Sequence, residues 1–132
     1  MTNVSKHALD TKHQEQLFSQ LAQLVHSSSK NETGAFLSEL FTDSEQIMFI
    51  KRLAVVLLLS KQQSAYRISK TLKMSESTVS QIRLKYEFGE YDSIIKISKK
   101  KEFDSKQFWL TLDVLLRAGM PSRGKDRWKS LR

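Results

Sequence analysis

A run of apolar residues between positions 47 and 59 constrains this chain more than any other feature. Eleven of the thirteen residues from Ile47 to Leu59 are apolar, and only Lys51 and Arg52 interrupt them. The capping-box sequence Thr42-Asp43-Ser44-Glu45 precedes the run and predicts a helix over residues 43–60. A helix that is apolar on every face must be buried on every face. A chain of 132 residues can hardly bury such a helix alone. A homodimer is the simplest solution, and a central helix in a monomeric bundle is the alternative.

The rest of the chain also predicts helices. It holds four Gly and one Pro, and alternation of apolar and polar residues is scarce, so we expect an all-α fold. Residues 27–34 are expected to form a loop, because Ser27 to Lys30, Asn31 and Gly34 interrupt the apolar pattern. The expected helices lie at residues 8–26, 35–41, 43–60, 64–72, 75–86, 94–97 and 105–118.

Several classes of protein are disfavoured. The chain has no cysteine, which excludes disulfides and cysteine-based zinc sites. The apolar run is too short and too charged to span a bilayer, which needs about 20 apolar residues. The N-terminal residues lack the apolar stretch of a signal peptide, so we expect a cytoplasmic protein. No paired carboxylates, nucleophile–base pair or histidine ligand spacing stands out, so we expect neither an enzyme nor a cofactor or metal.

Charge is distributed unevenly along the sequence. Residues 1–60 carry a net charge of −1 and residues 61–132 carry +9. A basic half beside a nearly neutral half suggests a face that binds a polyanion; general solubility is the alternative. A membrane-surface helix would need a large apolar face beside its basic residues, which the Lys99–Lys101 run lacks.

The segment at residues 64–86 has the apolar skeleton of a helix-turn-helix. Ser64 and Ser75 are expected to cap its two helices. The skeleton consists of five apolar residues that hold the helices together and one small residue where they cross: Ile68, Leu72, Met74, Val79, Ile82 and Ser69. Lys73 departs from the pattern, since glycine is commonest at the turn, and lysine there would need a less usual backbone or would adopt the left-handed conformation at a small cost.

If the second helix enters the major groove of double-stranded DNA, Val79 and Ile82 must face inward. The outward residues Ser77, Ser80 and Gln81 would then suit base edges, since glutamine can form two hydrogen bonds with adenine. Five basic residues are better placed for phosphates, which position the protein without specifying sequence: Arg67, Lys70, Lys73, Arg83 and Lys85. Leu84 also faces outward, and Glu76 stands near the helix N-terminus, where its charge is favourable and where it could contact cytosine.

Residues 36–91 resemble a known family, the Trp-repressor superfamily, and especially its small Trp-repressor-related bacterial regulators. The resemblance lies in Leu40-Phe41-Thr42-Asp43-Ser44-Glu45, Arg52-Leu53, Tyr66-Arg67-Ile68-Ser69-Lys70 and Ser77-Thr78-Val79-Ser80. It implies an intertwined all-α homodimer that regulates transcription. Residues 1–97 would form the dimerisation and DNA-binding domain, and residues 98–132 would add a C-terminal helix and a basic tail beyond the family core.

The resemblance also bears on whether this protein binds tryptophan as a corepressor. In the tryptophan-responsive repressor the indole lies between an arginine of the long helix and an arginine of the recognition helix. Arg52 matches the first, but Gln81 stands at the second, and Ile82 stands where the family has glycine. We therefore expect no tryptophan corepressor.

The leading hypothesis is a dimeric, sequence-specific transcriptional regulator that is associated with the nucleoid, and a repressor is favoured over an activator. Two alternatives stay open. One is a DNA-recognition subunit of a replication or transposition system, and the other is a protein-interaction adaptor with a degenerate helix-turn-helix.

Overall fold

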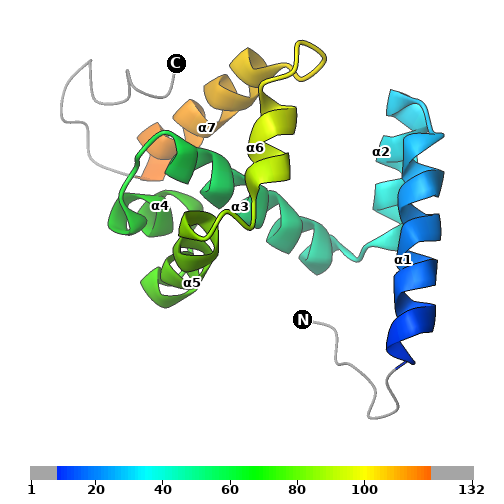
Figure 1. Cartoon of the computed structure of the whole chain (residues 1–132). Coiled ribbons are helices and arrows are strands. Elements are labelled where there is room, and N and C mark those ends of the chain that lie inside the picture. Colours follow the sequence, from blue (N-terminus) through cyan, green and yellow to red (C-terminus); the bar gives the residue numbers. More distant parts are fainter. Residues whose placement is uncertain (1–8, 120–132) are drawn as a thin grey trace. The chain divides into compact units, whose positions relative to one another are not determined.

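The computed structural model describes residues 9–119 of the chain, and the side chains of residues 9–115. Over this range it contains seven helices and no strand (Figure 1), which confirms the all-α prediction. The helices are α1 (Thr11–His26), α2 (Lys30–Leu40), α3 (Asp43–Ser60), α4 (Ala65–Leu72), α5 (Glu76–Glu87), α6 (Asp92–Ser98) and α7 (Ser105–Gly119). None of the helices in the described part is long and apolar enough to cross a membrane.

One sequence expectation is wrong: residues 30–34 are helical and not part of a loop. Ser29 forms a capping box at the start of α2, in which its hydroxyl accepts from the Glu32 backbone N–H (3.2 Å). In return the Glu32 carboxylate accepts from the Ser29 backbone N–H (2.9 Å). The Ser29 backbone N–H, and to a lesser extent the Ser29 hydroxyl, stabilise the charged carboxylate and so lower the pKa of Glu32 from its ordinary value near 4.5. Gly34 lies inside the helix, in open space, where its lack of a side chain is tolerated.

The predicted start of α3 is confirmed. The Thr42 hydroxyl accepts from the Glu45 backbone N–H (3.2 Å), and the Glu45 carboxylate accepts from the Thr42 backbone N–H (3.0 Å). Both bonds satisfy amides that have no partner inside the helix. The helix then runs to Ser60, as the apolar pattern predicted.

The chain divides by packing into two compact units, Met1–Phe49 and Ile50–Arg132. The sequence predicted another boundary at residue 97, between the dimerisation and DNA-binding domain and the C-terminal residues added to it. That boundary stays a prediction. In the first unit no residue from 9 to 49 is buried. The predicted basic tail at residues 122–132 lies outside the described residues.

The second unit has its own core. Its centre is the second half of α3, where every residue from Ala54 to Leu59 is buried. The core also takes buried side chains from α4, α5 and α7: Ile68, Leu72, Val79, Ile82 and Leu112. The C-terminal helix is therefore part of this core, and it packs against α4.

Three helices of this unit end in the same way. At each end, a backbone N–H beyond the helix donates to the carbonyl oxygen five residues before it, in the last turn of the helix. The three hydrogen bonds run from Gln63 to Leu58 (3.2 Å), from Met74 to Ser69 (2.9 Å) and from Glu90 to Lys85 (3.1 Å). Such an ending requires one residue with a left-handed backbone. That residue is Gln62 (φ 61°) after α3, Lys73 (φ 55°) after α4 and Gly89 (φ 78°) after α5. Of the two possibilities that the sequence left open for Lys73, the structure therefore has the left-handed backbone.

Candidate nucleic-acid interface

The segment from Ser64 to Glu87 folds as two helices joined by a short turn. The Ser64 hydroxyl accepts from the Arg67 backbone N–H (3.2 Å) at the start of α4, and the Ser75 hydroxyl accepts from the Thr78 backbone N–H (3.1 Å) at the start of α5. Both predicted N-caps are confirmed. Lys73 and Met74 form the turn between them, and α4 packs directly on α5.

Helix α5 has one buried face and one exposed face. Val79 is fully buried and Ile82 is 8% exposed, so both lie in the core as the sequence predicted. Ser77, Ser80 and Gln81 are exposed and follow one another at helical spacing, so they lie on a single stripe. The stripe continues to Leu84, which is 57% exposed. The outward face therefore offers two hydroxyls, one carboxamide and one apolar side chain together.

The predicted phosphate-binding residues differ in their surroundings. Lys70, Lys73 and Lys85 are exposed, whereas Arg67 is half-buried. The Lys70 ammonium lies 5.5 Å from the centre of the Tyr66 ring, within the range of a cation–π contact. Arg83 Nε donates to the Glu87 carboxylate (3.1 Å), four residues along the same helix. Both side chains are more than half exposed, so this ion pair holds Arg83 only weakly.

Glu76 lies exposed in the first turn of α5. A carboxylate there is stabilised by the unpaired amides of the helix start, so its position is explained without a base contact.

Two residues near this surface were missed by the sequence analysis. The Lys51 ammonium lies 3.4 Å from the Lys73 carbonyl oxygen, which brings another positive charge from α3 to the turn. Phe88, at the end of α5, is 82% exposed and continues the stripe of Leu84. Sequence spacing could have indicated Phe88, four residues after Leu84. It could not have indicated Lys51, which is 22 residues from Lys73.

Both positions at which the sequence argued against a tryptophan site lie on α5. Gln81 is exposed and carries no charge. Ile82 occupies the core, so its side chain fills space that a glycine would leave open.

Within the part of the chain that the structure describes, no group of three or more histidine, aspartate or glutamate residues could hold a metal ion. Comparison of the chain with protein-family models, with curated proteins and with solved structures found no match.

Proposed function

We propose that this protein is a sequence-specific regulator that binds double-stranded DNA as a homodimer, with α4 and α5 forming a helix-turn-helix. The observation that carries the proposal is the division of α5. Its core-facing side holds Val79 and Ile82, and its outward stripe holds Ser77, Ser80 and Gln81. A helix held in this way can lie in the major groove with its side chains at the base edges.

The chemistry of the surface fits DNA. Serine and glutamine side chains can donate to and accept from base edges, and Leu84 offers an apolar contact for a thymine methyl group. Lysines around the stripe supply charge for the phosphate backbone, chiefly Lys70, Lys73 and Lys85. Lys51, close to the turn, adds to that charge. Neutralising phosphates releases counterions, so binding should weaken steeply as salt rises.

The homodimer is supported by the apolar surface of the described chain before residue 54. Large side chains on α1, α2 and the first half of α3 are at least one third exposed: Leu17, Phe18, Leu24, Leu37, Leu40, Ile47, Phe49, Ile50 and Leu53. A helical segment without a buried residue cannot offset the conformational entropy lost on ordering. A second copy of the chain would cover these side chains, in the intertwined manner that the family resemblance implies.

Titration of labelled duplex DNA with the protein, followed by fluorescence anisotropy at several salt concentrations, tests the DNA proposal. We expect Lys70→Ala to weaken binding to all duplexes alike and to lower the salt slope. Gln81→Ala should instead change the sequence selected from a random duplex pool. Lys106→Ala, which removes an exposed lysine from α7, is the matched control and should leave both properties unchanged.

The results of these titrations, and of footprinting on genomic DNA, distinguish a DNA-binding regulator from the two alternatives. Binding that is insensitive to salt, or too weak to measure at low salt, would refute DNA recognition and favour a protein-interaction adaptor. If DNA binds but Gln81→Ala leaves the selected sequence unchanged, the outward stripe of α5 is not the reading surface. Footprints at origins or element ends, and not at promoters, would favour a replication or transposition role.

Sedimentation equilibrium tests the dimer. We expect a dimer at micromolar concentration, and we expect Ile50→Asp to shift it towards monomer, because that side chain is 63% exposed in one chain and would be buried in the pair. Val114→Asp, at an exposed apolar residue of α7, is the control. A stable folded monomer of the unaltered protein would refute the dimer.

A further inference from the structure

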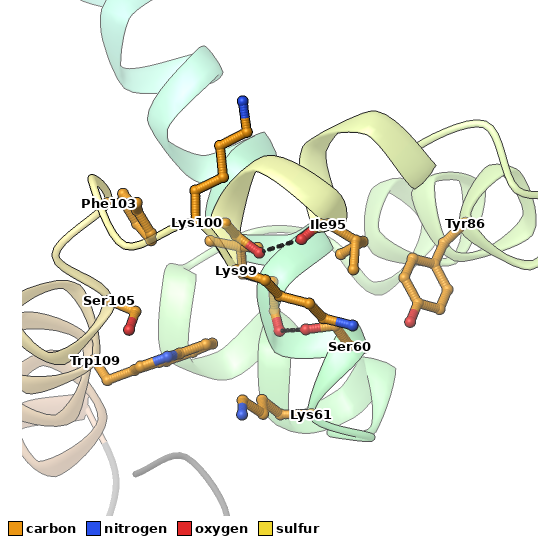
Figure 2. A pocket seen from close by; sticks show the side chains of 11 residues that line it. Ser60, Lys61, Tyr86, Ile95, Lys99, Lys100, Phe103, Ser105 and Trp109 are labelled. Carbon is orange, nitrogen blue, oxygen red and sulfur yellow. Dashed lines mark hydrogen bonds between the residues drawn. The ribbon is translucent and has the colours of Figure 1, made fainter.

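A cavity of about 510 Å³ lies in the second unit, where the ends of α3, α5 and α6 meet the start of α7. Figure 2 shows the side chains that line it. Its volume falls within the usual range for a small-molecule site, roughly 300–1,000 Å³. The cavity is separate from the outward stripe of α5, and one of its walls comes from the C-terminal helix.

The walls of this cavity combine apolar surface with positive charge. Leu57, Ile95, Phe103 and Trp109 supply aliphatic and aromatic surface. Three lysines line the cavity and none of its lining residues is acidic. The cavity therefore complements a molecule with an apolar body and a negative charge.

Two of the three lysines are placed to meet such a molecule. The Lys61 ammonium lies 5.6 Å from the centre of a Trp109 ring, which holds a positive charge beside an aromatic face. Figure 2 shows Lys99 extending to Ser60, between Trp109 and Tyr86, whereas Lys100 turns away from the cavity.

These lysines are not needed to complete the helix ends. The last carbonyls of α3 already accept backbone hydrogen bonds, from Lys61 N–H to Leu58 (3.0 Å) and from Gln62 N–H to Leu59 (2.9 Å). At the end of α6 the Lys99 N–H bonds to the Lys96 carbonyl (3.3 Å). Neither ammonium group forms a salt bridge with a carboxylate of the described residues, so both are available to a ligand.

We propose that this cavity binds a small carboxylate with a flat apolar body, with the ring against Trp109 and the carboxylate between Lys61 and Lys99. A charge-assisted hydrogen bond from ammonium to carboxylate is stronger than one between neutral groups. The site does not depend on DNA binding, and its test uses the protein alone.

The probe is sodium benzoate, titrated at constant ionic strength and followed through the indole N–H signal of Trp109 in a ¹⁵N–¹H spectrum. A Trp128→Phe background leaves Trp109 as the single tryptophan of the chain. We expect saturable shifts with a Kd on the order of 1 mM, as suits so small a ligand. Benzamide, which has the ring without the charge, and acetate, which has the charge without the ring, should each bind at least about tenfold more weakly.

Variants of the lysines complete the test. Lys61→Met and Lys99→Met keep an unbranched side chain of nearly the same length without its charge, and should each weaken benzoate about tenfold. Lys100→Met removes the same charge from the lining side chain that points away, and it should weaken benzoate far less than either of the other two variants. Equal affinity for benzamide and benzoate, equal loss in all three variants, or an unmoved Trp109 signal would overturn the proposal.

Discussion

The turn between α4 and α5 offers a test in which stability and DNA binding should change independently. Lys73 adopts a left-handed backbone, with φ 55° and ψ 54°, at the end of α4. A residue with a Cβ pays about 1–2 kcal/mol for that conformation, and glycine adopts it without steric cost. Glycine also loses more backbone entropy on folding, by about 0.5–1 kcal/mol. Lys73→Gly should therefore stabilise the fold by about 0.5–1 kcal/mol net, which corresponds to a rise in Tm of about 2–5 °C.

Two further variants isolate the cause. Lys73→Ala removes the same charge but keeps a Cβ in the left-handed conformation, so we expect no gain in stability. Gln62→Gly relieves the equivalent strain after α3, where φ is 61°, and should raise Tm by a similar amount. Thermal unfolding followed by circular dichroism, at one protein concentration for all variants, gives the comparison.

DNA binding should follow the charge and not the backbone. Both Lys73 variants lose a proposed phosphate contact, so each should lower the salt slope by about one per protomer. Gln62→Gly should leave the slope unchanged. If Lys73→Ala raises Tm as much as Lys73→Gly does, or if Gln62→Gly lowers Tm, the account of backbone strain is wrong.

The remaining predictions concern four other positions. Gly89→Ala should destabilise the fold by about 1 kcal/mol or more in thermal unfolding, because φ is 78° and the added Cβ would lie 3.1 Å from a carboxylate oxygen. Leu112→Ala should cost about 2–4 kcal/mol in denaturant unfolding, since this residue of α7 is 5% exposed in the core; a negligible loss would mean that α7 packs weakly. Ser29 lowers the pKa of Glu32, so the contribution of this carboxylate to stability is present above its ordinary value near 4.5 and is lost as the pH falls through the lowered pKa. NMR titration checks this, and Glu32→Gln should remove the dependence. L-Tryptophan should not tighten DNA binding, because Ile82 fills the core where the repressor has glycine; calorimetry showing saturable binding that raises DNA affinity would contradict this.

Features governed by local chemistry were predictable from the sequence. The caps at Thr42, Ser64 and Ser75 were found because a hydroxyl that precedes a helical apolar pattern can satisfy the first amides. Lys73 was singled out because glycine is commonest at this turn, although the sequence did not decide between a left-handed and another unusual backbone. The start of α2 was missed, since the capping box at Ser29 stands in a run of three serines followed by polar residues and Gly34.

Features governed by packing were not predictable. The approach of Lys51 to the turn depends on how α3 lies against α4, which no local pattern states. The cavity beside Trp109 depends on where α7 packs, and the family resemblance does not extend to that helix. The apolar run from 47 to 59 predicted burial on every face, but a single chain buries only Ala54 to Leu59 fully. The first half of the run is the part that the proposed dimer must cover.

Tyr86 connects the two proposed sites. It lies in the last turns of α5, is half-buried against the core of the second unit, and lines the cavity. A ligand held between Lys61 and Lys99 would contact the end of the same helix whose outward stripe would read DNA. A ligand shifts an equilibrium only as far as its affinity differs between two states. If the position of α5 differs between the free and DNA-bound protein, the carboxylate and the DNA must change each other's affinity by the same factor. If it does not differ, the cavity binds its ligand without any effect on DNA affinity.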